Sequence, residues 1–462
     1  MGFRIREFEA ESKFCRHISL EAIGRAVPPA AIEEALAEHD ARECRERKLN
    51  AFVTVLLVIA MSIFADLSIA HVLKKIAQGL RYVWPGPDCK VAGHAAISYR
   101  RYQMGARPLA TLFHRVCHPL ATPETPGAFL FGRRLMAIDG TVEDAPDTPE
   151  NAAAFGRHHS HRGAAAFPQV RAVYLAECGT HAIVDAGFWP IHTSERKGAA
   201  RMLRSVKPGM LLTVDAGLYE YDLVQATIQR ESDVLARLPG HVQAKPVQLL
   251  ADGSYLAHIR PSDYPRRSRG EHLLVRVIEY TFDDPGRPGY GQRHRLVTTL
   301  VDAESCPALE LICAYHERWE IEVTIDEIDS HQRLLGRPLR SQRPVGVIQE
   351  LYGLLIAHYA IRCLMHEAAM QAGLDPDRIS FVHALRVLQD AIPEFEMTAA
   401  EQLASLYTRL LSDMAAEPLP ARRNRINPRV VKRKMSNFKL KRPEHYRWPQ
   451  PRCSFAEAIV VI

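Results

Sequence analysis

The hydrophobic positions in the first quarter of the chain follow a helical spacing. Short amphipathic patterns cover residues 18–27 and 29–39, and the proline that opens the second pattern suits a first helical turn. The uncharged run 51–64, AFVTVLLVIAMSIF, has 14 residues, whereas a helix needs about 20 apolar residues to span a bilayer. We therefore predict a helical N-terminal region with a buried core helix and no membrane span.

The next region alternates between strands and helices. The apolar run LMAIDGT predicts a strand ending at Asp139, FPQVRAVYLAECG and HAIVDAGFW predict two strands joined by a short turn, and MLLTVDAG predicts a strand ending at Asp215. Helical patterns flank this last strand, and the short strand DVLARL follows. This order is that of the ribonuclease-H-like fold, in which the first strand, the end of the fourth strand and a helix after the fifth each supply an acid.

Period-two alternation with turn signals returns at 241–302 and predicts a β-rich insertion. A helical pattern then begins near Pro307, carries Glu322 and runs to about Gln332. The predicted fold class is α/β: a ribonuclease-H-like catalytic domain with a β-rich insertion, between an N-terminal helical domain and a C-terminal helical region with a basic tail. The predicted boundaries are 1–128 for the N-terminal helical domain, which we expect to bind DNA, 129–345 for the catalytic domain and 346–462 for the C-terminal region.

The helix that carries Glu322 gathers polar groups on one face. With about 100° per residue, five side chains fall within an arc of about 80°: Tyr315, Arg318, Glu322, Asp326 and Asp329. Surface helices usually offset such charges with opposite charges four residues away. This stripe has few of them, so we interpret its acid cluster as costly unless a cation is bound there.

Composition narrows the class of protein. A chain of 462 residues can bury a large core in two or three domains, and 47% hydrophobic with 24% charged residues is ordinary for a soluble globular protein. The nine cysteines form no CxxC pair, which argues against a disulfide framework and against a cysteine-based structural zinc site. A reduced, cytoplasmic location fits best.

The net charge of +6 is unevenly distributed. Between residues 419 and 447 eleven Lys or Arg stand against the single acid Glu444, so this segment carries +10 and the remaining chain −4. Such a block suggests nucleic acid as a partner, although a solvated tail is the alternative. The tail residues that we predict to contact DNA are Arg422, Arg423, Arg425, Arg429, Lys432, Arg433 and Lys434.

Three segments resemble the acidic motifs of DDE transposases from bacterial insertion sequences, of the insertion-sequence-four type with its Y-R-E-K signature. They are AIDGTVEDAPDTPENAAAFG, MLLTVDAGLYEYDL and YHERWEIE. The likeness extends to LRSQRPVGVIQELYGLLIAHYAIR and NPRVVKRKMSNF, and so covers nearly the whole chain. It implies that Asp139, Asp215 and Glu322 are a catalytic triad that binds metal.

The resemblance also assigns residues around this triad. Tyr315 and Arg318 match the first two letters of the signature and are implied to contact DNA, and Trp319 follows Arg318 as an aromatic residue often does in the family. Trp319 could stack on an unpaired base or be a core residue. Two positions depart from the family: Asp329 stands where the signature has lysine, and Ala216 where the second motif usually has arginine. At each of these two positions the family has a positively charged side chain, expected near the DNA backbone, that this chain lacks.

The family likeness implies two Mg²⁺ ions, for which Mn²⁺ would substitute, and double-stranded DNA as the partner. The DNA would comprise the element's terminal inverted repeats and the target, and pairing of two ends implies a dimer on DNA. Two ions about 3.5–4 Å apart can activate the attacking oxygen of an in-line displacement and stabilise the leaving one. Two carboxylates about 4 Å apart repel by about 4 kcal/mol at an effective dielectric constant near 20, so converging acids imply a cation.

These observations predict a DNA transposase that binds the ends of its insertion sequence, cleaves strands and joins them to a target. Two alternatives stay open. One is a catalytically impaired or domesticated remnant that only binds DNA, which Asp329 and Ala216 favour. The other is a standalone nuclease on the same fold, which would cut without strand transfer. Metal-dependent cleavage at specific ends separates these readings.

Overall fold

The computed structural model describes residues 4–8, 16–42, 49–80, 92–161, 163–287, 289–333, 336–421, 431–432, 439–440 and 451–462. The chain forms two compact units, each assembled from segments far apart in the sequence. Unit 1 comprises Met1–Ala128, Gly140–Ser205 and Glu320–Pro420, and unit 2 comprises Phe129–Asp139, Val206–Trp319 and Ala421–Ile462.

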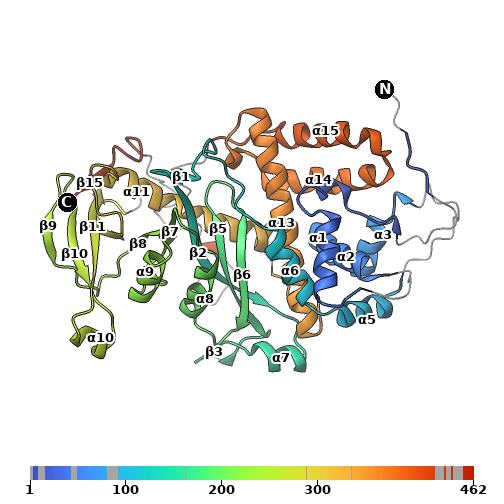
Figure 1. The fold of residues 1–462 in the computed structure, drawn as a ribbon, viewed down its shortest axis with the longest axis horizontal. Coiled ribbons are helices and arrows are strands. Elements are labelled where there is room, and N and C mark those ends of the chain that lie inside the picture. Colours follow the sequence, from blue (N-terminus) through green and yellow to red (C-terminus); the bar gives the residue numbers. More distant parts are fainter. Residues whose placement is uncertain are drawn as a thin grey trace. The chain divides into compact units, whose positions relative to one another are not determined.

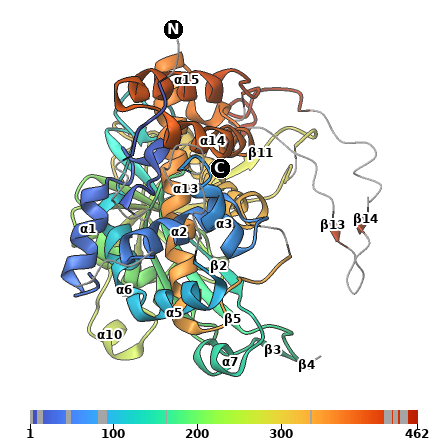
Figure 2. The same ribbon diagram turned by 90° about the vertical axis from the view of Figure 1, so that its right-hand side faces the viewer.

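Unit 1 is built around the long helix α13 (Pro344–Ala372), which packs against α2 (Ala51–Ile63), α6 (Arg107–Val116), α14 (Phe381–Met397) and α15 (Leu403–Ala415) (Figures 1 and 2). By length and composition α13 could cross a membrane, but its most apolar 18-residue window is 78% buried inside the protein. Helix α2 is buried along nearly its whole length. Both are core helices, which confirms the prediction of a buried N-terminal core helix.

The smaller helices of unit 1 are α1 (Pro29–Glu38), α3 (Ile69–Ile76), α5 (His94–Met104), α7 (Pro149–Phe155), η3 (Leu203–Ser205), η5 (Pro376–Arg378) and η6 (Ala400–Gln402). Helix α1 confirms the prediction over 29–39. The helix predicted over 18–27 is wrong, because only a single 3₁₀ turn, η2 (Glu21–Ile23), forms there and packs against α14. Gly24 ends this turn, since glycine disfavours a helix interior, and Pro28 disfavours the helical conformation for Val27 before it.

Unit 1 also contains the predicted pair of strands and the helix after them. β5 (Gln169–Glu177) and β6 (Ile183–Pro190) pair antiparallel, and α8 (Glu195–Met202) packs on both. A two-residue hairpin, β3 (His159–Ser160) and β4 (Gly163–Ala164), precedes them.

Unit 2 is a mixed sheet. Its parallel part consists of β2 (Arg133–Asp144), β7 (Met210–Val214) and β8 (Asp233–Arg237), in that order. Antiparallel strands continue from β8: β12 (His294–Thr298), β11 (Leu273–Phe282), β10 (Tyr255–Ile259) and β9 (Pro246–Leu249). These four strands confirm that residues 241–302 are β-rich, and they extend the same sheet beyond β8.

Short strands and three helices complete unit 2. They are β1 (Phe129–Leu130) on β2, β15 (Ile459–Val461) on β11, the paired strands β13 (Val431–Lys432) and β14 (Lys439–Leu440), and the helices α9 (Tyr221–Ile228), α10 (Tyr264–Ser268) and α11 (Ala308–Glu317). Helices α9 and α11 both pack on β8. In chain order, β2, the β5–β6 hairpin, α8, β7, α9 and β8 reproduce the predicted order of strands and helices.

The first strand is longer than predicted. β2 does not end at Asp139 but runs on to Asp144. The Asp-Gly pair therefore marks no turn. Gly140 instead admits the side chain of Glu195, since a Cβ at position 140 would lie 2.5 Å from its Oε1 atom. The glycine is explained by close packing within a strand.

Candidate active site

The two predicted aspartates of unit 2 belong to neighbouring parallel strands or directly follow them: Asp139 lies in β2, and Asp215 is the residue after β7. Arg134 of β2 pairs with Met210 of β7, and Ala137 pairs with Thr213, an offset of 76 residues in each case. The same offset brings Asp139 opposite Asp215, the first residue after β7. Adjacent strands are about 4.8 Å apart, so the two carboxylates start from neighbouring points of one sheet edge.

The loop after β7 fixes the orientation of Asp215. Its Oδ1 atom accepts a hydrogen bond of 2.8 Å from the backbone N–H of Leu218. A Cβ added at Gly217 would lie 3.2 Å from the Oδ2 atom, so the loop passes close to the carboxylate. This local bond closes a tight turn of the kind that aspartate favours.

An arginine at the corresponding position of the third parallel strand escaped the sequence analysis. Val214 of β7 pairs with Ala236 of β8, and the same register places Arg237 beside Asp215. Arg237 is exposed and ends β8. By extension of the two registers, Asp139 of β2, Asp215 after β7 and Arg237 of β8 occupy equivalent positions. The sequence does show an arginine as the last residue of the strand DVLAR. A single sequence does not give the register between β7 and β8, however, so it cannot show that this arginine lies near Asp215.

Tyr315 and Arg318 lie at the end of α11. The Nη1 atom of Arg318 is 3.6 Å from Oδ2 of Asp139, and its guanidinium carbon is 5.9 Å from the centre of the Tyr315 ring. Burial raises the pKa of Tyr315, while Arg318 and Arg237 lower it and Asp215 raises it further. The hydroxyl of Tyr315 is therefore near enough to Asp215, Arg237 and Arg318 for their charges to shift its pKa.

Trp319 is 41% exposed, so the core-residue alternative is wrong. It begins α12 (Trp319–Asp326), which carries Glu322 half-buried in its first turn. Glu322 belongs to unit 1, whereas Asp139, Asp215, Tyr315 and Arg318 belong to unit 2.

The predicted single helix is three successive segments. α11 ends at Glu317, α12 ends at Asp326, and a π-helical segment, η4 (Glu327–Gln332), completes the run. The π turn begins after Asp326 and changes the rotation per residue, so Asp329 leaves the stripe expected for an ideal α-helix. Asp326 is exposed and interacts with Ser330, while Asp329 is half-buried.

Asp329 has partners, which corrects the interpretation of an acid stripe without opposite charges. Thr141 donates a 3.2 Å hydrogen bond to its Oδ2 atom, and Nη1 of Arg333 lies 3.7 Å from its Oδ1 atom. Arg333 also pairs with the buried carboxylate of Glu143. Burial raises the pKa of Asp329 to about 6, against the Thr141 hydrogen bond, which lowers it. The acid at the position of the expected lysine is integrated into unit 1.

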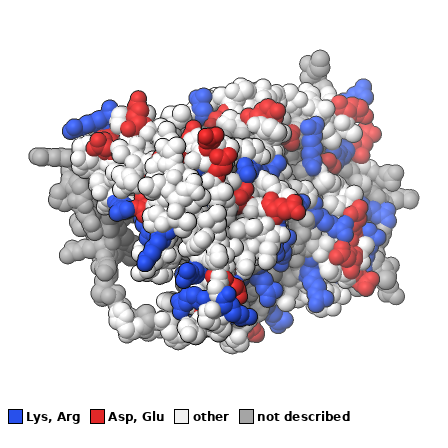
Figure 3. Space-filling view, turned by 60° about the vertical axis from the view of Figure 1, so that its left-hand side comes forward, with Lys and Arg blue, Asp and Glu red and all other residues white. Residues whose placement is uncertain are grey.

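The predicted DNA contacts of the tail fall mostly outside the described residues. These are Arg422, Arg423, Arg425, Arg429, Arg433 and Lys434, whereas Lys432 belongs to the short strand β13. Over the described residues on the face drawn in Figure 3, basic and acidic side chains are interspersed. The tail's role therefore remains a prediction from charge.

The donor chemistry at these positions of the sheet edge suits a hard divalent cation. Asp139 and Asp215 offer carboxylate oxygens from adjacent strands, the ligand type that Mg²⁺ and Mn²⁺ prefer. Arg237 and Arg318 add positive charge at the same edge. Carboxylates that can hold a metal beside guanidinium groups that can bind phosphate are the components needed for phosphodiester chemistry.

Comparisons with known proteins agree with this description. The family described as "Insertion element 4 transposase N-terminal" matches residues 17–114, and the family described as "Transposase DDE domain" matches residues 130–360. The second range, half of the chain, contains Asp139, Asp215 and Glu322.

One transposase is similar to this chain over most of its length, and another is similar over less than a third. The chain is 28% identical over 419 residues to the "Transposase InsG for insertion sequence element IS4" of Escherichia coli strain K12, covering 89% of this chain and 92% of that protein. It is 28% identical over 137 residues to the "Putative transposase InsZ" of the same organism, covering 29% and 46%. A solved structure of the piggyBac transposase synaptic complex with hairpin DNA aligns with a TM-score of 0.44 at 12% identity, covering 89% of this chain and 87% of that one.

Proposed function

Because this chain belongs to the DDE transposases of the insertion-element-4 type, an enzyme family, we propose that it cleaves the ends of its own insertion sequence and joins them to target DNA. The reaction centre would be Asp139, Asp215 and Glu322. The observation that carries the assignment is the strand register, which by extension gives Asp139, Asp215 and Arg237 equivalent positions. Two acids and a guanidinium at one sheet edge fit a divalent cation and a phosphodiester.

The three acids would hold two divalent cations, Mg²⁺ or Mn²⁺. When bound, such ions activate an attacking oxygen and stabilise a leaving one. Carboxylates that converge on one point repel each other unless positive charge lies between them. Arg318, at 3.6 Å from Asp139, supplies part of that charge in the protein itself.

The protein's own groups would position the DNA backbone. Arg318 ends α11 next to Asp139, and its forked donors suit a phosphate oxygen pair. Arg237 would contribute a second cation beside Asp215 and so offset the arginine that Ala216 replaces. Trp319, being 41% exposed, would stack on a base unpaired near the cleaved bond.

Other parts of the chain would hold and pair the DNA ends. We propose residues 1–128 as an end-binding domain, 129–345 as the catalytic domain, and 346–462 as a helical region with a phosphate-binding tail. The family match over 17–114 supports a dedicated N-terminal domain. The duplex partners would be the terminal inverted repeats and the target, with a dimer on paired ends, in the cytoplasm where a bacterial chromosome lies.

The alternative is a transposase that binds DNA without cutting it, for which Asp329 is the specific observation. Its carboxylate occupies the expected lysine position and is held by Thr141 and Arg333. A negative charge there would repel a phosphate. The cation at Arg237 favours the active enzyme, because it keeps a guanidinium beside the aspartate pair.

A cleavage assay distinguishes the two. The full chain is incubated with linear DNA carrying the element's ends and Mg²⁺ or Mn²⁺, as wild type, Asp139→Ala, Glu322→Ala and Asp329→Lys. Metal-dependent nicking that both alanine variants lose, with end binding retained, supports the proposal. Inactivity of the wild type with recovery in Asp329→Lys identifies an enzyme disabled at that position. Inactivity of every variant, with DNA binding intact, refutes the catalytic assignment.

A further inference from the structure

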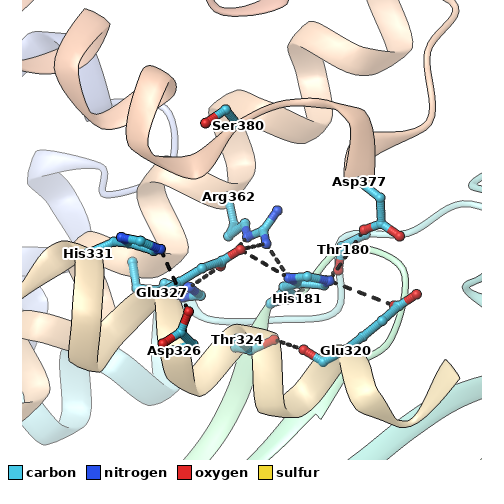
Figure 4. Close-up of polar contacts among 12 residues, drawn as sticks. Thr180, His181, Glu320, Thr324, Asp326, Glu327, His331, Arg362, Asp377 and Ser380 are labelled. Carbon is cyan, nitrogen blue, oxygen red and sulfur yellow. Dashed lines mark hydrogen bonds and ion pairs between the residues drawn. The ribbon is translucent and has the colours of Figure 1, made fainter. Parts of the chain in front are cut away.

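Unit 1 contains a second group of ionisable side chains, separate from the residues of the proposed reaction (Figure 4). His181, Glu320 and Asp377 come from three segments distant in the sequence: the turn before β6, the first turn of α12, and η5. They are 3%, 8% and 8% exposed. Three potential metal ligands thus converge where water has little access.

The distances among these groups suit ligands of one metal ion. The Nε2 atom of His181 lies 3.3 Å from Oδ1 of Asp377 and 3.8 Å from Oε2 of Glu320. One ligand atom from each of the three residues fits within 4.8 Å of the others. Ligands about 2.0–2.2 Å from a tetrahedral zinc ion are themselves roughly 3.3–3.6 Å apart, so small adjustments would complete the geometry.

The opposite side of the imidazole has the support that metal-binding histidines usually have. Nδ1 of His181 lies 3.3 Å from Oε1 of Glu327, and a carboxylate behind the ring is the common device that orients a ligating histidine. Arg362 donates to Glu327, and His358 lies 3.1 Å from its Oε2 atom. Burial raises the pKa of Glu327, but Arg362, His181 and His358 together hold that pKa well below its usual range. Glu327 is therefore an anchored carboxylate.

The Nε2 atom of His181 gives evidence for a metal ion that does not depend on the distances. It is buried, points between the two carboxylates in Figure 4, and makes no hydrogen bond of acceptable geometry with any described residue. Buried carboxylates are costly unless positive charge or hydrogen bonds compensate them. Oε2 of Glu320 accepts one such hydrogen bond, 2.6 Å long, from the backbone N–H of Gly179. A metal ion among the three residues would add positive charge beside the carboxylates of Glu320 and Asp377.

We propose that His181, Glu320 and Asp377 bind one transition-metal dication of the zinc class, with a water molecule as a further ligand. Mixed imidazole and carboxylate donors suit zinc better than they suit Mg²⁺. The ion would tie the turn before β6 and η5 to α12. Because Glu320 stands two residues before Glu322, this site would hold the helix that carries the candidate catalytic glutamate.

The metal-free alternative has a definite chemical form. The guanidinium of Arg362 also contacts Nδ1 of His181. If Nδ1 of His181 accepts a hydrogen bond from Arg362, the neutral imidazole carries its proton on Nε2. That N–H can then donate to Oδ1 of Asp377. One proton cannot serve two carboxylates, but the arrangement needs no metal, and it predicts that neither Zn²⁺ nor Co²⁺ binds.

The test measures Zn²⁺ and Co²⁺ binding in a background that removes the reaction-centre acids. The full chain with Asp139→Ala and Asp215→Ala is stripped with chelator and titrated with each ion, followed by calorimetry and by Co²⁺ absorption. Asp377→Asn keeps the shape of the side chain but weakens the ligand, and His181→Ala removes a ligand. His358→Gln is the matched control, because His358 contacts Glu327 but is not among the three ligands. Circular dichroism checks that each variant is folded.

The proposal predicts about one Zn²⁺ per chain in the background protein, with a Co²⁺ spectrum of low coordination number and an increase in Tm on adding Zn²⁺. Asp377→Asn and His181→Ala should weaken binding by more than about 100-fold, whereas His358→Gln should weaken it far less. The absence of Zn²⁺ and Co²⁺ binding in the background protein would overturn the proposal. So would binding that persists in a folded Asp377→Asn variant. Both results are independent of DNA cleavage.

Discussion

At the scale of single residues, Arg237 is the cation that the strand register adds to the candidate reaction centre. It ends β8 beside Asp215, where the family's usual arginine is replaced by Ala216. If Arg237 binds the phosphate being cleaved, Arg237→Gln should lower the cleavage rate by about 10- to 100-fold, since a hydrogen bond to a charged group contributes about 1.5–3 kcal/mol.

The measurement is single-turnover nicking with saturating DNA, alongside end binding by gel shift. Arg269→Gln is the control, because Arg269 is exposed beyond α10 and its Nε atom donates to the backbone of Pro265. Unchanged nicking in Arg237→Gln would remove Arg237 from the reaction, and equal losses in both variants would indicate a general effect of charge on DNA binding.

Asp329 leads to a prediction about stability and pH. Its pKa is raised by burial to about 6 from an ordinary value of 3.8, so the folded state holds its proton more tightly than the unfolded state. Stability from this group is therefore present below pH 4 and lost as the pH rises through 6. Asp329→Asn should be more stable than wild type at pH 7, by up to about 3 kcal/mol, and the difference should shrink toward pH 4.

Urea unfolding of both proteins between pH 4 and pH 8 measures this difference. Arg333 could oppose the effect, but its closer ion pair is with Glu143. A wild-type protein that is the more stable one at pH 7 would mean that the Arg333 interaction outweighs the burial of Asp329. In that case the acid at the lysine position would be a stabilising element of unit 1.

At the scale of helices and strands, α13 and α2 approach each other closely at Gly353. A Cβ at Gly353 would lie 2.7 Å from Cγ1 of Val58 and 2.8 Å from its backbone oxygen. The backbone oxygen cannot move aside as a flexible side chain can, so Gly353→Ala should separate the helices and cost about 1–3 kcal/mol. Thermal unfolding measures it, with Gly93→Ala as control because nothing lies within 4 Å of a Cβ there. A Gly353→Ala protein as stable as the control would show that the helices yield without loss.

The sequence predicted elements better than it predicted how they align. Apolar runs ending in aspartate identified β2 and β7, and their acids lie in or directly after these adjacent strands. The break assumed at Asp139 was wrong because Gly140 serves packing against Glu195, which no local pattern reveals. Likewise, the π segment after Asp326 changes which side chains share a face, and hydrophobic spacing cannot distinguish it from an ordinary helical turn.

Sites made from distant segments were the least predictable. Arg237 depends on the register between β7 and β8, and the His181 group joins three segments that are together only in the folded unit. Single-sequence patterns describe neighbours within about one turn or one strand. The resemblance to a family supplied the proposed triad Asp139, Asp215 and Glu322, which no local pattern joins, but carried no information on the buried histidine.

At the scale of the whole molecule, the residues after 418 comprise a basic block and a segment that belongs to a sheet. Residues 451–462 belong to the fold of unit 2, because β15 pairs with β11 and Phe455 packs against Phe282 and His316. The preceding segment carries the concentrated positive charge. Deleting everything after residue 418 would therefore remove a strand together with the basic block, and loss of DNA binding in such a protein would be uninterpretable. Neutralising the basic residues separates the two effects.

Replacing Arg422, Arg423, Arg425, Arg429, Lys432, Arg433 and Lys434 with glutamine lowers the net charge from +6 to −1. If these side chains neutralise phosphates, the log–log slope of DNA affinity against salt should flatten by about 0.9 per lost contact, or about 6 for all of them. The control changes only the five arginines to lysine, which keeps every charge and should keep the slope. An unchanged slope in the glutamine variant would mean that the tail does not contact the backbone. A slope that flattens in the lysine variant as well would point to specific arginine contacts, because electrostatic neutralisation alone requires only positive charge.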